Sequence, residues 1–164
     1  MALKLEDKKL VVEEVSAHVA ESVSMVVAEY RGLTVDQMTN LRAKARQSDV
    51  VVRVVKNTLA RKAVAGTPFE DLTDTLVGPV VLLFSKSELS AAARVSKDFI
   101  KENDALVVKG LSIGSGAMDA SQLATVAALP TYEEAIAKLM YVMNAPVEKL
   151  ARTLAAYKEA KEAA

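Results

Sequence analysis

The chain has 164 residues, 51% of them hydrophobic, and its 21 basic and 21 acidic residues give a formal net charge of zero. This length suits one domain with an appendage. Because the chain has no Cys and a single His, we expect neither disulfides nor zinc sites, and no Cys–His or Ser–His nucleophile. Since no apolar run approaches the ~20 residues that cross a bilayer, and acids interrupt any signal-peptide core near the N-terminus, we expect a soluble cytoplasmic protein without a metal or cofactor.

The first 66 residues alternate between helical and strand patterns. Apolar side chains at helical spacing open the chain, and two short runs rich in Val follow. Thr34 and Gln37 have the spacing of a capping box, and Gly66 suits the left-handed position that ends a helix. The predicted elements are a helix over Lys4–Ser22, a strand over Val23–Tyr30, a helix from Thr34 to about Gln47, a strand over Val50–Val55 and a short basic helix that is capped by Asn57 and stops at Gly66.

The next part of the chain, to residue 129, repeats this alternation. Thr67 and Pro68 have the order of an N-cap followed by the first helical position. The run VVLLF has no polar alternation, so we expect a strand that is buried on both faces. The predicted elements are one or two helical turns ending at Leu76, a strand over Val80–Phe84, a helix capped by Ser87 and running to about Asn103, a strand over Leu106–Ile113, a turn at Gly114–Gly116 and a short helix over Ser121–Ala128.

The order of these elements is a helix, a β-α-β unit, a helical insert and a second β-α-β unit. Two such units favour an α+β fold with a ferredoxin-like, split β-α-β sheet of four strands and extra helices. A doubly wound parallel sheet is the competing topology, which the element order leaves open. We expect residues 1–129 to form this globular domain and residues 130–164 to form an extended C-terminal helical spine.

The spine carries a repeated apolar stripe. It opens at a capping box, Thr131–Glu134, and its apolar residues recur at a spacing of eleven, close to three helical turns, so that both copies fall on nearly the same face. Pro146 lies between the copies and is expected to kink the helix. The residues of the stripe are Tyr132, Ile136, Leu139, Met140, Met143, Val147, Leu150, Ala151 and Leu154.

An apolar stripe usually packs on its own domain, but this tail is long for that purpose. A helix of about 33 residues spans roughly 50 Å at 1.5 Å per residue, which is more than a domain of this size needs to cover itself. The duplicated stripe suits two identical partners bound side by side, with Met140 and Met143 as adaptable contacts. The sequence therefore predicts a partner-binding helix.

Basic residues gather in residues 42–62, which hold seven cationic side chains and one acidic side chain. Such a local surplus in a neutral chain indicates a polyanionic partner, although two solvated helix faces are the alternative. Arg53 lies mid-strand, where an RNA-recognition motif places stacking aromatic residues, so we expect folded RNA to be bound through its shape and charge with little base stacking. Arg42 and Arg46 share one helix face, and Lys56 lies at a helix N-terminus that favours phosphate.

Catalysis is disfavoured by what the sequence lacks. It contains neither a GxGxxG nor a Walker pattern, and its paired glutamates are sequence neighbours, whose side chains diverge by ~100° on a helix. A ferredoxin-like enzyme such as a small phosphatase is the catalytic alternative, because Arg31, Gly32 and Asn57 can imitate an anion-binding loop.

Four motifs of this chain resemble, in order and spacing, the motifs of one family, that of the bacterial large-subunit ribosomal protein L-ten, the stalk-base protein. They are Tyr30-Arg-Gly-Leu-Thr34, Val54-Val-Lys-Asn-Thr-Leu59, Gly78-Pro79 and Leu129-Pro-Thr-Tyr-Glu-Glu134. The resemblance spans essentially the full length. It implies a non-catalytic ribosomal protein whose N-terminal domain binds large-subunit rRNA beside the stalk-base protein L-eleven. It also implies that the C-terminal spine carries dimers of the acidic stalk protein L-seven/L-twelve, which recruit translational GTPases.

Two groups of residues are predicted to bind RNA. Those in family motifs are Arg31, Gly32, Lys56, Asn57 and Thr58, and those chosen for charge and position are Arg42, Arg46, Arg53, Arg61 and Lys62. The repeat in the spine predicts two stalk dimers. A free RNA-binding regulator with a self-associating helical tail is the alternative function. The protein is thus expected in the cytoplasm, on the large ribosomal subunit.

Overall fold

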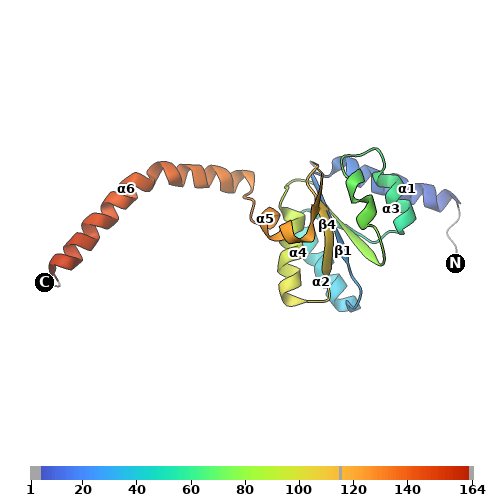
Figure 1. Ribbon diagram of the computed structural model, residues 1–164, viewed down its shortest axis with the longest axis horizontal. Coiled ribbons are helices and arrows are strands. Elements are labelled where there is room, and N and C mark those ends of the chain that lie inside the picture. The colour runs from blue at the N-terminus through green and yellow to red at the C-terminus, as the bar shows by residue number, and fades with distance from the viewer. Residues whose placement is uncertain (1–4, 115, 163–164) are drawn as a thin grey trace. The chain divides into compact units, whose positions relative to one another are not determined.

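The computed structural model describes residues 5–114 and 116–162 of the chain (Figure 1). Two β-α-β units follow one another, with a helix before the first and a helical insert between them. The helices are α1 (Leu5–Glu21), α2 (Val35–Gln47), α3 (Asn57–Val64), α4 (Ala91–Glu102), α5 (Leu123–Ala127) and α6 (Tyr132–Glu162), with the 3₁₀ turns η1 (Glu70–Thr75) and η2 (Ala120–Gln122). The strands are β1 (Ser24–Glu29), β2 (Val50–Arg53), β3 (Val80–Ser85), β4 (Val107–Ser112) and β5 (Ala117–Asp119).

The strands form one antiparallel sheet in the order β2-β3-β1-β4-β5. The first four positions follow the split β-α-β arrangement, so the α+β, ferredoxin-like prediction is confirmed and the doubly wound parallel alternative is wrong. β1 lies at the centre of the sheet, where Val27 pairs with Leu82 of β3 and with Gly110 of β4.

The short strand β5 extends the sheet beyond the four strands that the sequence predicts. Gly114 and Gly116 have φ values of 79° and 122°, which residues with a Cβ rarely adopt, and they turn the chain so that Ala117 pairs with Ser112. The predicted turn also includes Ser115, which lies outside the described residues. With 3 residues, β5 is too short to leave a periodic pattern in the sequence.

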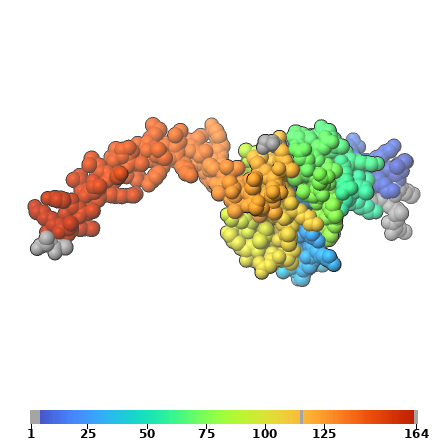
Figure 2. Space-filling view, viewed as in Figure 1, coloured from blue at the N-terminus to red at the C-terminus, as the bar shows by residue number. Residues whose placement is uncertain are grey.

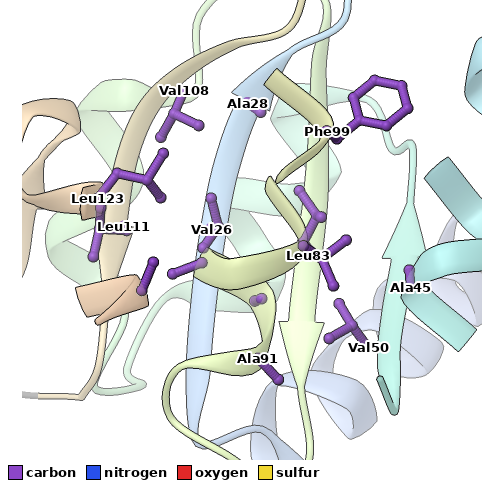
Figure 3. Packing of buried hydrophobic residues seen from close by; sticks show 14 of the residues in the cluster. Val26, Ala28, Ala45, Val50, Leu83, Ala91, Phe99, Val108, Leu111 and Leu123 are labelled. Atoms are coloured by element: carbon purple, nitrogen blue, oxygen red, sulfur yellow. The ribbon is translucent and has the colours of Figure 1, made fainter. Parts of the chain in front are cut away.

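One face of the sheet is covered by α2, α4 and α5 (Figure 3). Val26 and Ala28 of β1 and Leu83 of β3 face this layer, because alternate residues of a strand point to the same side. They share one buried cluster with Phe99 of α4 and Leu123 of α5. Leu41 and Ala45 of α2 are buried in the same cluster, which fixes the position of α2 and hence of the arginines that it carries.

The other face is covered by α1, α3 and η1, which build a second buried cluster. Val15 and Val19 of α1 belong to it together with Val64 of α3, and the two helices lie side by side, in blue and green, in Figures 1 and 2. β3 contributes alternate residues to both clusters, and all of its residues are buried, as its unbroken apolar run predicts. The sheet is therefore sandwiched between two helical layers.

Two predicted helix caps are wrong because their side chains bind elsewhere. Asn57 is the first residue of α3, whose cap is Lys56, and the Asn57 side chain bonds outside the helix. The Thr67 hydroxyl donates to the carbonyl of Val64 at 2.6 Å, so it closes the turn after α3 and does not cap η1. The helical turns predicted before Leu76 are present as the 3₁₀ segment η1.

The start of α4 also lies later than predicted. The helix begins at Ala91, with Ser90 and not Ser87 at the cap position. The Ser85 hydroxyl donates to the carbonyl of Glu88, which holds the chain in a turn over the residues where the helix was expected to begin. The predicted end near Asn103 is confirmed, since α4 ends at the preceding residue.

Contacts divide the chain into two compact units, residues 1–129 and residues 130–164. At the start of the second unit, the Thr131 hydroxyl accepts from the Glu134 N–H at 3.3 Å and the Glu134 carboxylate accepts from the Thr131 N–H at 3.1 Å, so the predicted capping box is present. α6 then continues through Pro146 as one helical element that changes direction along its length in Figure 1. Among the described residues, no helix has both the length and the apolar character needed to cross a membrane.

Candidate nucleic-acid interface and exposed helix

A shallow hollow, here called the corner hollow, lies at the end of the sheet where three segments distant in sequence meet. It is lined by Tyr30 after β1, by residues 54–58 between β2 and α3, and by residues 78–80 at the start of β3, and its volume is about 470 Å³. Of the predicted RNA-binding residues it contains Lys56, Asn57 and Thr58. Three of the motifs that carry the family resemblance therefore converge on one place.

Hydrogen bonds join the three segments of the corner hollow. The Asn57 Nδ2 donates to the carbonyl of Gly78 at 2.9 Å, which ties the start of α3 to the turn before β3. The Tyr30 N–H donates to the carbonyl of Pro79 at 3.3 Å, which ties the end of β1 to the same turn. The hollow is thus a fixed part of the fold.

Arg31 and Gly32 form the turn that follows Tyr30. Gly32 has a φ of 93°, a conformation that favours glycine, and the Leu33 N–H donates to the carbonyl of Tyr30 at 3.2 Å to close the turn. Gly32 therefore contributes backbone geometry. Arg31 is exposed and follows directly after Tyr30, so it adjoins the corner hollow along the chain.

Three of the predicted arginines line a second concavity beside β2, here called the edge groove. Arg42 and Arg46 of α2 and Arg53 of β2 surround it together with His18 of α1, and its volume is about 560 Å³. The Arg53 guanidinium lies 3.7 Å from the carboxylate of Glu14. Because β2 is an outer strand of the sheet, the groove opens at the side of the domain.

Arg61 and Lys62 line neither concavity. The Arg61 Nη2 donates to the carbonyl of Leu76 at 3.0 Å, so this side chain joins α3 to the segment after η1. Lys62 lines a different surface between α1 and α3, together with Lys8 and Lys9. The basic block of the sequence is therefore not one surface, and its cations are divided among several surfaces of the domain.

Three cations of the two concavities are available to an external anion. In residues 5–114, which the structure describes, the side chains of Arg42, Arg46 and Lys56 are exposed and form neither an ion pair nor a hydrogen bond. A guanidinium or ammonium group without a carboxylate partner can neutralise a phosphate without first breaking an internal pair. This arrangement suits the backbone of a nucleic acid.

The predicted partner-binding stripe lies on α6 and is open to solvent. The exposed fractions of its large side chains run from 41% at Ile136 to 81% at Tyr132. Tyr141, Val142 and Tyr157 of the same helix are exposed as well, although they lie outside the predicted stripe. Apolar surface that reaches water along a helix is stabilised when a partner covers it.

The corner hollow also contains residues that are absent from the set predicted to bind RNA. Tyr30, Val54 and Pro79 line it. None of the three carries a charge, and the residues predicted to bind RNA are Gly32 and residues with charged or polar side chains. All three stand within the motifs quoted for the family resemblance, which is the signal that points to them.

Comparisons with known proteins relate both units to one family. Residues 3–101 match the family described as Ribosomal protein L10, and residues 129–164 match that described as Ribosomal protein uL10 C-terminal region. A large ribosomal subunit protein uL10 of Hydrogenovibrio crunogenus is 68% identical over 163 residues, which cover 99% of this chain and 98% of that protein. The uL10 protein of Alcanivorax borkumensis is 56% identical over 154 residues, which cover 94% of this chain and 88% of that protein.

Proposed function

Since this chain belongs to the ribosomal protein L10 family, also named uL10, we propose that it is the scaffold that anchors the stalk to the large ribosomal subunit. Membership of the family makes it a structural protein of the large subunit and not an enzyme. The proposal assigns rRNA binding, beside the protein L-eleven, to residues 1–129. It assigns the dimers of the acidic stalk protein L-seven/L-twelve, which recruit translational GTPases, to residues 130–164.

One observation supports the assignment of RNA binding and partner binding to different units. Exposed cations without partners, such as Arg42, Arg46 and Lys56, lie on the first unit, whereas an unburied apolar stripe occupies the second. The first surface suits phosphate groups, and the second suits partner helices. Asn57, Thr58 and Gly32 are proposed to shape the RNA site.

The salt dependence of binding to large-subunit rRNA tests the first half of the proposal. The proposed phosphate contacts are Arg31, Arg42, Arg46, Arg53 and Lys56, with Arg61 and Lys62 at the margin. About five such contacts predict a slope of roughly −3 to −5 when the logarithm of the affinity is plotted against that of the salt concentration. A slope near zero for the unaltered chain would contradict rRNA anchoring.

A matched pair of variants then tests the edge groove. Arg42→Gln combined with Arg46→Gln removes two unpaired cations and should make the slope shallower by about one to two. Lys138→Gln combined with Lys149→Gln, which removes two exposed cations from α6, should leave the slope unchanged. An equal change in both variants would mean that overall charge, and not the groove, binds the RNA.

Native mass spectrometry of the chain with the acidic stalk protein tests the second half. The two copies of the stripe predict two dimers, so four stalk chains per scaffold are expected. Six stalk chains would contradict this valency, and no complex at all would contradict the role of α6. A homodimer of the scaffold formed through α6, detected by size exclusion with light scattering, would instead favour the free RNA-binding regulator.

A further inference from the structure

The corner hollow has an apolar wall that phosphate contacts do not use. Tyr30, Val54 and Pro79 line it, and Val54 keeps 43% of its surface exposed although it is a large aliphatic residue. Its volume of about 470 Å³ lies within the range of small-ligand pockets, roughly 300–1,000 Å³. The neutral wall and the concave shape indicate a flat, partly apolar ligand in addition to an anion.

Tyr30 is held in place from two sides. It is half-buried and packs against the cluster between the sheet and the α2–α4 layer, while its N–H is bonded to the carbonyl of Pro79. An aromatic residue that is fixed before binding loses little conformational entropy when a ligand stacks on it. Fixed aromatic side chains at an RNA surface commonly carry unstacked bases.

Polar groups surround this apolar wall. Lys56 is exposed and without an internal partner at the rim, where it can meet a phosphate. The Asn57 Nδ2 is engaged by the carbonyl of Gly78, so the amide has a fixed orientation and its Oδ1 is left to accept an N–H from a base edge. The Thr58 hydroxyl adds a donor and an acceptor of the kind that a ribose 2′-OH can use.

We propose that the corner hollow binds a single nucleobase that is extruded from a bulge or loop of large-subunit rRNA. The base lies against Tyr30 and Pro79, and its phosphate lies on Lys56. A bulge or loop is required because the bases of a continuous A-form duplex are stacked and cannot enter a hollow. The inference rests on the proposed rRNA anchoring. It replaces the expectation of little base stacking, which is drawn from Arg53 standing mid-strand where an RNA-recognition motif has an aromatic residue.

Binding of the full chain to in vitro transcribed large-subunit rRNA over a range of salt concentrations tests the inference. Tyr30→Leu keeps apolar bulk for packing but removes the aromatic ring, and it should lower the affinity by roughly fivefold or more with an unchanged salt slope. Lys56→Gln should lower the affinity and make the slope shallower by about one. Tyr30→Phe keeps the ring and should bind like the unaltered chain.

The matched control is Tyr157→Leu, which makes the same substitution at an exposed tyrosine of α6 and should change neither the affinity nor the slope. Circular dichroism shows whether each variant is folded. If Tyr30→Leu is unfolded, Pro79→Ala takes its place, because it removes the other ring of the wall from an exposed turn.

Chemical probing of the same rRNA gives a second readout. The unaltered chain should change the reactivity of one unpaired base, and Tyr30→Leu should abolish that change while Tyr157→Leu retains it. If Tyr30→Leu and Pro79→Ala both bind rRNA at full affinity and with salt dependence, the proposed base site is wrong. The proposed rRNA anchoring is then not contradicted. Failure of the unaltered chain to bind rRNA in a salt-dependent manner would overturn both.

Discussion

Gly110 of β4 lies directly beneath η1, where there is little room for a side chain. A Cβ at this position would lie 3.0 Å from Thr75 Cγ2 and 3.3 Å from Leu72 Cδ2. We expect Gly110→Ala to lower the free energy of unfolding by about 1–2 kcal/mol, because the steric cost of overpacking exceeds the entropy that alanine removes from the unfolded chain. Urea unfolding followed by circular dichroism measures the change.

A second substitution at the same contact serves as the control. Thr75→Ser removes the Cγ2 atom but keeps the hydroxyl, which donates to the carbonyl of Leu72 at 2.7 Å. In this background Gly110→Ala should cost less than it does alone, since the closest atom is gone. An equal cost in both backgrounds would show that the clash with Thr75 is not the cause.

The ion pair between Glu21 and Lys86 predicts a pH dependence of stability. A hydrogen bond from Lys86 at 2.8 Å and its positive charge lower the pKa of Glu21, and the same contacts raise the pKa of Lys86. The contribution of Glu21 is therefore present above its unfolded pKa, near pH 4, and is lost as the pH falls through its lower folded pKa.

Glu21→Gln should therefore be slightly less stable than the unaltered chain at pH 7 and equally stable at the acidic end of the titration. The effect is small because the ion pair is open to solvent, with 61% of the Glu21 side chain exposed. Glu13→Gln, on the same helix and without a described ion pair, is the comparison that separates this pair from the general effect of charge. A difference that persists unchanged into acid would contradict the assignment.

Single residues differ in how far the sequence predicts their contacts. The capping box at Thr34 and Gln37 is predicted correctly, because its partners are three residues apart and bond within one turn. The RNA contacts of Asn57 and Arg61 stay a prediction, and the sequence does not show their bonds to the carbonyls of Gly78 and Leu76, which come close only once the domain is folded. Local chemistry is visible in the sequence, and contacts across the fold are not.

At the scale of elements, the apolar stripe of α6 predicts that its two copies act separately. Leu150 and Leu154 belong to the second copy and are 61% and 62% exposed, so charged residues there do not disturb a core. Leu150→Asp combined with Leu154→Asp should remove one stalk dimer and leave the other, which native mass spectrometry would detect as a loss of two stalk chains per scaffold.

The first copy offers the matched experiment. Leu139→Asp combined with Met143→Asp should also remove one dimer, since these residues hold the equivalent positions eleven residues earlier. Glu133→Gln is a control outside the stripe and should leave both dimers bound. If either double variant removes every stalk chain, the two copies form one cooperative site.

Elements with a long periodic or unbroken apolar pattern are the ones that the sequence predicts well. β3 and α2 are examples, since their boundaries lie within about a residue of the predicted ones. β5 is different, because its 3 residues leave no pattern, and η1 is predicted only as one or two helical turns, without its 3₁₀ geometry. The sequence does not distinguish a serine cap at residue 87 from one at residue 90, because the choice depends on the turn that the Ser85 hydroxyl closes.

At the scale of the whole molecule, the sheet order follows from the two β-α-β units, but the second helical layer does not. α1 and α3 are separated by two strands and a helix in the chain, and only the buried cluster that they share with β3 shows that they cover one face. The position of the corner hollow is likewise not predicted by the sequence. Its three segments are individually visible as motifs, and their convergence is a property of the fold.

The division of the chain into two units predicts the effect of removing the second one. All core residues of the described chain lie before residue 130, so a chain ending at Pro130 should keep its core and its thermal unfolding transition. The removed segment carries five basic and five acidic residues, so the electrostatic attraction between the domain and RNA should also be preserved.

We therefore expect the chain ending at Pro130 to bind large-subunit rRNA with the affinity and salt slope of the full chain and to bind no stalk dimers. Parallel rRNA titrations and native mass spectrometry of the two proteins measure both properties. Loss of rRNA binding on truncation would contradict the separation of the two functions, because it would make α6 part of the RNA site. Stalk chains retained by the shortened protein would contradict the assignment of the exposed stripe as their binding surface.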